Sequence, residues 1–335
     1  MSSDAKDEST EYNKKLKAYA FIAILSVINV ASIAEASKVM PTNPTKDSGS
    51  IGTGINLLWG LFTLLFSVII IVIDVVGIMK DKFDFGTAMD GKIEGYTLLL
   101  FNLVWTAGVI SLTRAGGLGY AALNVYFSTW LAYFGCIYAL DMWLGEKEYV
   151  TIKKLCSLSA TLPYWWILWF ASIVTFGSAA DARRLLVGEE EQQQLLRDSC
   201  SLAIAIGLVS FCVSLFFILS HYEFLQCNMC TTWMTYGGIF ELAVNLVVDI
   251  WQVVGIHFLT SAGKIGSSLT GQGDVGDADY VPGSNIYFAT WASMVASISI
   301  TAKWKQAKAM KFARAQNEEV NDEGGLDITD VDDEI

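Results

Sequence analysis

The sequence predicts an all-α membrane protein, a polytopic helix bundle in which eight transmembrane helices form two parallel four-helix repeats. Of its 335 residues, 53% are hydrophobic and only 17% are charged, a composition typical of membrane proteins. The apolar residues gather into eight segments, each close to the roughly 20 residues that a helix needs to cross a bilayer. A third observation, a sequence pattern that occurs twice, predicts the duplication.

The predicted transmembrane helices follow one another with mostly short polar connections. None of the apolar segments alternates with the two-residue period of a barrel strand, so the pattern favours helices over strands. In order along the chain, the segments are 18–37, 55–79, 95–113, 121–144, 159–180, 199–220, 234–260 and 285–304.

The duplication is visible at two registers. Five residues that open the fourth segment recur in the same order and spacing in the eighth, and the same shift of 161 residues carries Trp143 onto Trp304. The middle of each half aligns at a shift of 147, which pairs Glu94 with Glu241, and a longer loop at 261–284 absorbs the difference. The five residues are Asn124, Tyr126, Phe127, Thr129 and Trp130 in the first copy, and Asn285, Tyr287, Phe288, Thr290 and Trp291 in the second.

The number of helices in each unit determines how the two copies are related. Because each unit has an even number of spans, both copies enter the membrane from the same side, which excludes inverted repeats. The predicted parts are a cytoplasmic N-terminal segment at 1–17, a first repeat at 18–144, a cytoplasmic linker at 145–158, a second repeat at 159–304, and a basic helix extension with an acidic tail at 305–335.

Basic residues near the span ends predict that both termini are cytoplasmic, because lysine and arginine favour that side of a membrane. Lys14 to Lys17 precede the first span, Lys153 and Lys154 lie in the linker, and further basic residues follow the last span. An alternative is that the first segment is a cleaved secretory signal, since Ala34-Glu35-Ala36 imitates a cleavage site, and seven spans would then remain. Which membrane holds the protein is not predicted.

Polar residues spaced along single helix faces are the candidate functional residues. One face lies in the seventh span and another in the second, and the 147-residue shift carries the second face onto the sixth span. We expect these faces to point away from lipid. The candidates are Glu241, Asn245, Asp249 and Gln252 in the seventh span; Asn56, Ser67 and Asp74 in the second; Ser210, Ser214 and His221 in the sixth; and Glu94 and Asn102 in the third.

Asp249 is the sharpest candidate because it is expected near mid-membrane, where a carboxylate is paired, protonated or facing water. One hypothesis is a proton or cation site, in which Glu241 passes a proton to Asp249 with Asn245 as a hydrogen-bonding bridge. The alternative is that these residues join neighbouring helices by hydrogen bonds, each contributing about 0.6 to 2 kcal/mol.

The cysteines are candidates for lipidation rather than for a metal site, and otherwise they are inert. His221, Cys227 and Cys230 lie close in sequence but offer no clear fourth ligand, so no zinc site is predicted. Cys156, Cys227 and Cys230 are expected beside the cytoplasmic face, where cysteine is the usual acceptor of palmitate. We expect no metal and no cofactor.

The C-terminal region predicts two kinds of partner. Lys303 to Arg314 are spaced to continue a basic helix, with Trp304, Met310 and Phe312 among them, and this helix could contact anionic lipid. From Glu318 onward the tail is strongly acidic and is expected to be disordered, either solvating the chain or docking a cytoplasmic protein. The lipid bilayer is the main partner, and no nucleic acid is expected.

Two functions follow from these features. The first is a non-catalytic membrane-organising or scaffold role, for which tetraspan proteins offer an analogy to one unit. The second is a channel or a proton- or cation-coupled transporter with a polar site centred on Asp249. A membrane enzyme is the third choice, because the sequence has no histidine cluster and no nucleophile elbow.

Overall fold

The computed structural model describes residues 3–39, 57–58, 60–72, 92–114, 118–121, 123–149, 151–186, 191–222, 224, 237–261, 265 and 284–323. Throughout these residues the regular structure is helical. Asn56, Asp74, Cys227 and Cys230, together with the acidic tail beyond residue 323, lie outside the described residues.

The chain divides into two compact units, Met1–Ile152 and Lys153–Ile335. The boundary falls within the segment 145–158 that the sequence assigns to a linker. Unit 1 contains α1 (Ser3–Val39), a short helix at Gly60–Val72, α3 (Lys92–Thr113), α4 (Leu118–Ala121) and α5 (Leu123–Glu146), and the boundary falls at the first residue of α6 (Ile152–Cys156), which otherwise lies in unit 2. Unit 2 contains α7 (Leu162–Leu185), α8 (Glu191–His221), α9 (Ile239–Thr260) and α10 (Ser284–Glu323).

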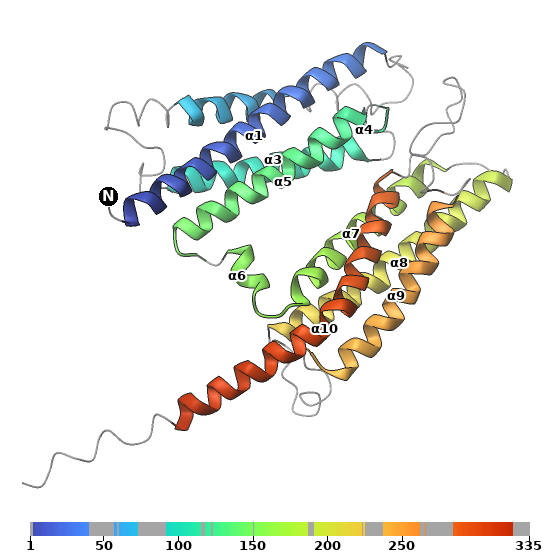
Figure 1. The fold of residues 1–335 in the computed structure, drawn as a ribbon. Coiled ribbons are helices and arrows are strands. Elements are labelled where there is room, and N and C mark those ends of the chain that lie inside the picture. The colour runs from blue at the N-terminus through green and yellow to red at the C-terminus, as the bar shows by residue number, and fades with distance from the viewer. Residues whose placement is uncertain are drawn as a thin grey trace, which may run out of the picture. The chain divides into compact units, whose positions relative to one another are not determined.

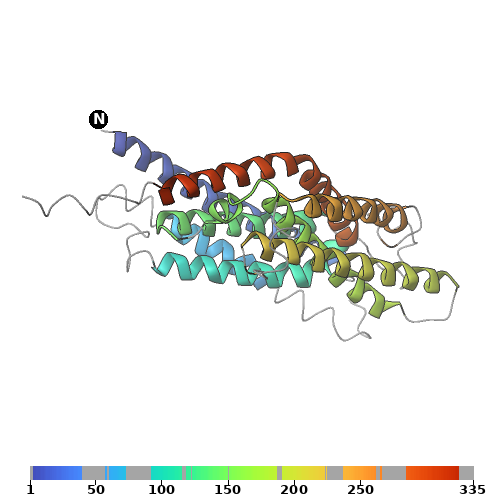
Figure 2. The same cartoon turned by 90° about the horizontal axis from the view of Figure 1, so that it is seen from below.

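In unit 1, α5 packs against α1 and α3, and the three helices lie side by side (Figures 1 and 2). Small residues four apart on α5 make this possible, because Ser128, Ala132 and Cys136 are all buried. The core between the helices also contains larger side chains, including Tyr19 and Ile22 of α1 and Leu98, Phe101 and Trp105 of α3.

In unit 2, α10 packs against α7 and α9, and α7 packs along α8 (Figure 1). The small residues of α10, Ala289, Ser293 and Ser297, are buried as their counterparts on α5 are. The rings of Trp165 on α7 and Phe217 on α8 stack at 4.5 Å in the core. One side of each long helix in this unit is therefore packed against the neighbouring helices.

The opposite sides of the helices are apolar and exposed. Leu103 and Ile110 of α3 are 69% and 65% exposed, and Val247 and Ile250 of α9 are 67% and 68% exposed. Large apolar surfaces of this kind are stable in lipid rather than in water. Five described helical segments are long and apolar enough to cross a membrane: 16–35, 92–113, 162–184, 194–221 and 239–260.

The structure supports an integral membrane protein made of helices, and the number of spans stays a prediction. The helix described within the predicted second span, Gly60–Val72, is shorter than a membrane crossing needs. The other two predicted spans correspond to α5 and to the first half of α10, which are not among the five segments above.

Candidate functional site: the buried polar residues

The polar face predicted on α9 is turned toward the other helices of unit 2. Glu241, Asn245 and Gln252 are at most 1% exposed, and Asp249 is half-buried. These residues recur at the spacing of a single helix face, so packing of that face against the other helices buries three of them and partly buries Asp249. Each of them is bonded to a neighbouring helix or to the segment beside it.

Glu241 lies in the first turn of α9 and accepts three hydrogen bonds. The indole N–H of Trp165 donates to Oε1 at 2.7 Å, and the hydroxyl of Thr161 donates to the same oxygen at 3.0 Å. The backbone N–H of Gly237 donates to Oε2 at 2.6 Å, in a turn where the φ angle of +72° favours glycine. Three converging donors suit a carboxylate, and the N-terminal end of a helix also favours negative charge.

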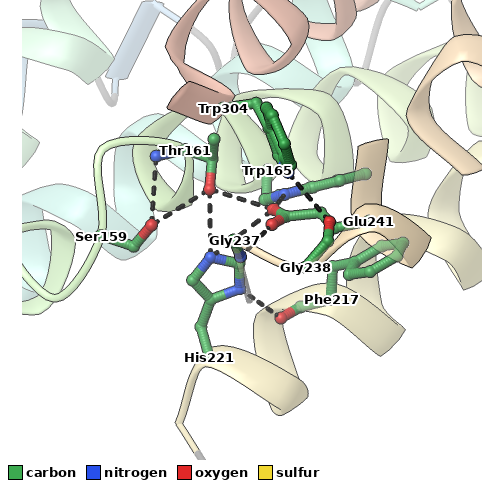
Figure 3. Close-up of polar contacts among 9 residues, drawn as sticks. All are labelled: Ser159, Thr161, Trp165, Phe217, His221, Gly237, Gly238, Glu241 and Trp304. Atoms are coloured by element: carbon green, nitrogen blue, oxygen red, sulfur yellow. Dashed lines mark hydrogen bonds and ion pairs between the residues drawn. The ribbon is translucent and has the colours of Figure 1, made fainter. Parts of the chain in front are cut away.

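His221, the last residue of α8, lies beside this carboxylate. Its Nδ1 is 2.7 Å from the carbonyl oxygen of Phe217, a contact that requires Nδ1 to carry a hydrogen. Its Nε2 is then directed at Thr161, 3.1 Å from Oγ1, and lies 3.7 Å from Oε1 of Glu241. Figure 3 shows Thr161, Trp165 and His221 converging on Glu241 from different elements.

Two further residues complete this cluster. The backbone N–H of Thr161 donates to the hydroxyl oxygen of Ser159 at 3.3 Å, and the hydroxyl oxygens of the two residues lie 3.1 Å apart. Trp304 of α10 donates its indole N–H to the carbonyl of Gly238 at 2.9 Å (Figure 3). The polar cluster therefore ties all four helices of unit 2 together at one end.

A second network joins α9 to α10. Asn245 donates to the carbonyl of Ser297 at 2.9 Å and to the hydroxyl of Thr301 at 2.7 Å. Thr301 in turn donates to Oδ2 of Asp249 at 2.7 Å. Asn245 therefore does not bridge Glu241 to Asp249, as the sequence hypothesis required: it reaches Asp249 through Thr301, while Glu241 is engaged by α7 and α8.

Gln252 completes the face of α9 by donating to the hydroxyl of Ser210 on α8 at 2.7 Å. Ser210 and Ser214 are buried, and each hydroxyl also bonds a carbonyl of its own helix. The polar face predicted on the sixth span therefore points inward, toward α9.

Unit 1 contains a shorter series of polar contacts. Glu94, in the first turn of α3, is buried and accepts a hydrogen bond of 2.7 Å from the hydroxyl of Tyr19 on α1. Asn102 donates to the carbonyl of Cys136 on α5 at 3.1 Å. Ser67 is fully buried, with no hydrogen-bond partner for its hydroxyl among the described residues.

Several residues of these networks were not predicted. Thr161, Trp165 and Thr301 hold the two networks of unit 2 together, and Asn29 of α1 donates to Ser128 and Thr129 of α5. Of these residues, only Asn29 could have been predicted from the sequence. It is a polar residue within an apolar span, and a buried amide in a membrane needs a hydrogen-bond partner. The others have residue types too common near span ends to stand out.

The described residues include no group of three or more His, Cys, Asp and Glu side chains that could hold a metal ion. Cys156, predicted as a lipidation site, ends α6 and is half-buried. Comparison of the chain with protein-family models, with curated proteins and with solved structures finds no match.

Proposed function

We propose that this protein is a non-catalytic membrane-organising or scaffold protein, whose buried polar residues join its helices rather than line a transport path. The observation that carries this proposal is the way in which the α9 side chains are bonded. Glu241, Asn245, Asp249 and Gln252 each contact a residue from another helix or its flanking turn within unit 2. Paired contacts of this kind are typical of interhelical hydrogen bonding in membrane proteins.

The proposal includes the four-helix repeat, and two pairs of contacts support it. Glu94 and Glu241 each accept a hydrogen bond from an aromatic donor of the first long helix of their unit, and the partners lie 75 and 76 residues apart in sequence. The carbonyls of Cys136 and Ser297, which the 161-residue shift relates, each accept a hydrogen bond from an asparagine on the third predicted span of their unit. The packing of α5 on α1 and α3 in unit 1 also resembles the packing of α10 on α7 and α9 in unit 2.

The second candidate is a channel or a proton- or cation-coupled transporter, and one observation favours it. Asn245 Oδ1, Asp249 Oδ1 and Gln252 Oε1 are buried acceptor oxygens on the same side of α9, with no partner among the described residues. Oxygen atoms of this kind are ligands that cations use. A transport function would therefore centre on Asp249, as the sequence hypothesis proposes.

Ion flux into liposomes containing the purified full chain distinguishes the two candidates. For a scaffold, we expect H⁺, Na⁺ and K⁺ flux no greater than in protein-free liposomes, and the same result for Asp249→Asn. A wild-type flux that Asp249→Asn abolishes, with the variant still expressed and folded, would establish transport. Fluorescence energy transfer between labelled chains in the same liposomes tests organisation directly: a scaffold should cluster, whereas randomly dispersed chains would contradict the proposal.

The remaining proposals concern the cytoplasmic side. Both termini are assigned to the cytoplasm, the cysteines Cys156, Cys227 and Cys230 to palmitoylation, and the acidic tail to solvation or to a cytoplasmic protein partner. These assignments suit a membrane-organising protein, because acylated cysteines and charged tails link a membrane to soluble components.

A further inference from the structure

A pocket of about 370 Å³ lies at one end of unit 1, between the beginning of α3 and the end of α5. Lys92 and Tyr96 of α3 line one side, and Trp143 of α5 lines the other, together with Lys147 and Tyr149, which follow in the chain. The volume is within the range of small-molecule sites, about 300 to 1,000 Å³. It belongs neither to the polar cluster around Glu241 nor to the contacts of Glu94.

The end of α5 forms one wall of the pocket. The N–H of Tyr149 donates to the carbonyl of Leu144 at 2.8 Å, and that of Glu148 donates to Gly145 at 3.2 Å, which is the bonding pattern of a Schellman helix end. Glu148 takes the left-handed conformation that this ending requires, with φ of +58°. The chain therefore turns back, and the ring of Tyr149 comes to lie 5.8 Å from that of Trp143.

Gly95 forms the floor of the pocket. It allows the indole of Trp143 to lie directly on α3, since a Cβ atom at this position would come within 2.2 Å of a ring carbon. The repeat register places Leu242 at the corresponding position of unit 2, and Lys308, the counterpart of Lys147, lies within the continuous helix α10, 5.4 Å above the ring of Trp304. The features that open the pocket in unit 1 are therefore replaced in unit 2.

Positive charge at the pocket comes from Lys92 and Lys147. Neither lysine forms an ion pair with a carboxylate within the described part of the chain. The buried carboxylate of Glu94, beside Gly95 in sequence, accepts a hydrogen bond from Tyr19, whereas Glu146 and Glu148 are exposed and do not line the pocket.

The pocket also continues toward lipid. Lys92 opens a helix that is long and apolar enough to span a membrane, so it lies near the headgroup level. Tyr96 and Leu99, 69% and 47% exposed, extend the lining along α3 toward the apolar layer.

We propose that this pocket binds the phosphate of an anionic phospholipid headgroup. The ammonium groups of Lys92 and Lys147 contact the phosphate, the rings of Trp143 and Tyr149 lie beside it, and an acyl chain follows Leu99 along α3. Basic pockets between helices at a membrane surface bind headgroups of this class. The proposal goes beyond the organising role, because it holds for a scaffold and for a transporter alike.

Native mass spectrometry of the detergent-solubilised full chain tests this proposal, with titration by phosphatidylinositol 4-phosphate, by phosphatidylcholine and by inorganic phosphate. We expect the phosphoinositide to bind more tightly than either of the others. Lys92→Gln with Lys147→Gln should weaken its binding about 30-fold, since each lysine near a membrane surface contributes about fivefold. The charge-preserving pair Lys92→Arg and Lys147→Arg should stay within about twofold of wild type.

The matched control is Lys153→Gln with Lys154→Gln, which removes two exposed lysines of α6 that do not line the pocket. Its phosphoinositide affinity should equal that of wild type. The proposal is overturned if the control loses as much affinity as the pocket pair, if the pocket pair binds normally, or if inorganic phosphate binds as tightly as the lipid.

Discussion

Glu241 shows how much of a buried polar site depends on residues that are distant in sequence. Its helical spacing with Asn245 and Gln252 could be predicted to face inward, because that spacing is a property of a single helix. Its partners could not, since Trp165 and Thr161 lie 76 and 80 residues away, and only packing brings them together. The same holds for Thr301, which the sequence hypothesis omitted and which links Asn245 to Asp249.

Replacing Glu241 by glutamine should destabilise unit 2 by about 2 kcal/mol, the size of the hydrogen bonds that a charged group makes. The glutamine amide keeps the shape of the side chain, but its NH₂ group would replace one of the two accepting oxygens. That group would then face either the donors Trp165 and Thr161 or the donor Gly237, and the hydrogen bonds on that side would be lost. Unfolding of the purified protein in detergent measures the change. Glu146→Gln, at an exposed position of α5, should stay within about 0.5 kcal/mol of wild type, and equal stabilities for the two variants would contradict this account of the cluster.

At the scale of the element, hydropathy predicts where the helices lie but not where they end, because helices continue beyond the apolar segments. The structure begins α1 at Ser3, well before the predicted span at residue 18, and it continues α10 unbroken to Glu323. The basic stretch from Lys303 to Arg314 is helical, as its spacing predicts. Because α10 is one continuous helix, this stretch extends the helix of the predicted last span, and its contact with anionic lipid stays a prediction.

The contact between α7 and α8 depends on Gly207. A Cβ atom at this position would lie 2.7 Å from Cβ of Phe176 and 3.0 Å from the carbonyl oxygen of Ser172. Gly207→Ala should therefore separate the two helices and lower the free energy of unfolding by about 1 to 3 kcal/mol. Gly177→Ala on α7 is the matched control, since its Cβ would meet no atom within 4 Å. It should be neutral or slightly stabilising, and a loss equal to that of Gly207→Ala would rule out steric contact as the cause.

The end of α5 offers a substitution that should stabilise the protein. Glu148 holds a left-handed conformation at the position where glycine is usual, which costs about 1 to 2 kcal/mol for other residues. Glu148→Gly should therefore raise the free energy of unfolding by about 0.5 to 1 kcal/mol after the added entropy of the unfolded chain is subtracted. Glu146→Gly, at the last residue of the same helix, should not raise it, because the backbone there is already helical and glycine is a poor helix former. A lower free energy of unfolding for Glu148→Gly would contradict this expectation. It would show that the Glu148 side chain stabilises the protein by more than its left-handed backbone conformation costs.

At the scale of the whole molecule, an even number of spans in each unit is the premise of the proposed topology. The sequence supports it through two repeat registers. The structure divides the chain into two units, and α5 packs on α1 and α3 in one unit as α10 packs on α7 and α9 in the other. Five segments meet the length and hydropathy that a crossing needs. The other three predicted spans rest on the sequence and its repeat, and they stay predictions.

Single cysteines placed in the full chain, with its six native cysteines replaced by serine, test this topology. Ser157 and Gln316 are exposed positions after the fourth and eighth predicted spans, and Ser261 follows the seventh. In sealed vesicles of one orientation, a membrane-impermeant maleimide should label cysteines at 157 and 316 from the same side and one at 261 from the other. Detergent should make all three reactive, which controls for local accessibility. Labelling of 157 and 316 from opposite sides would mean that the second unit crosses the membrane an odd number of times, so that the two units could not be parallel copies.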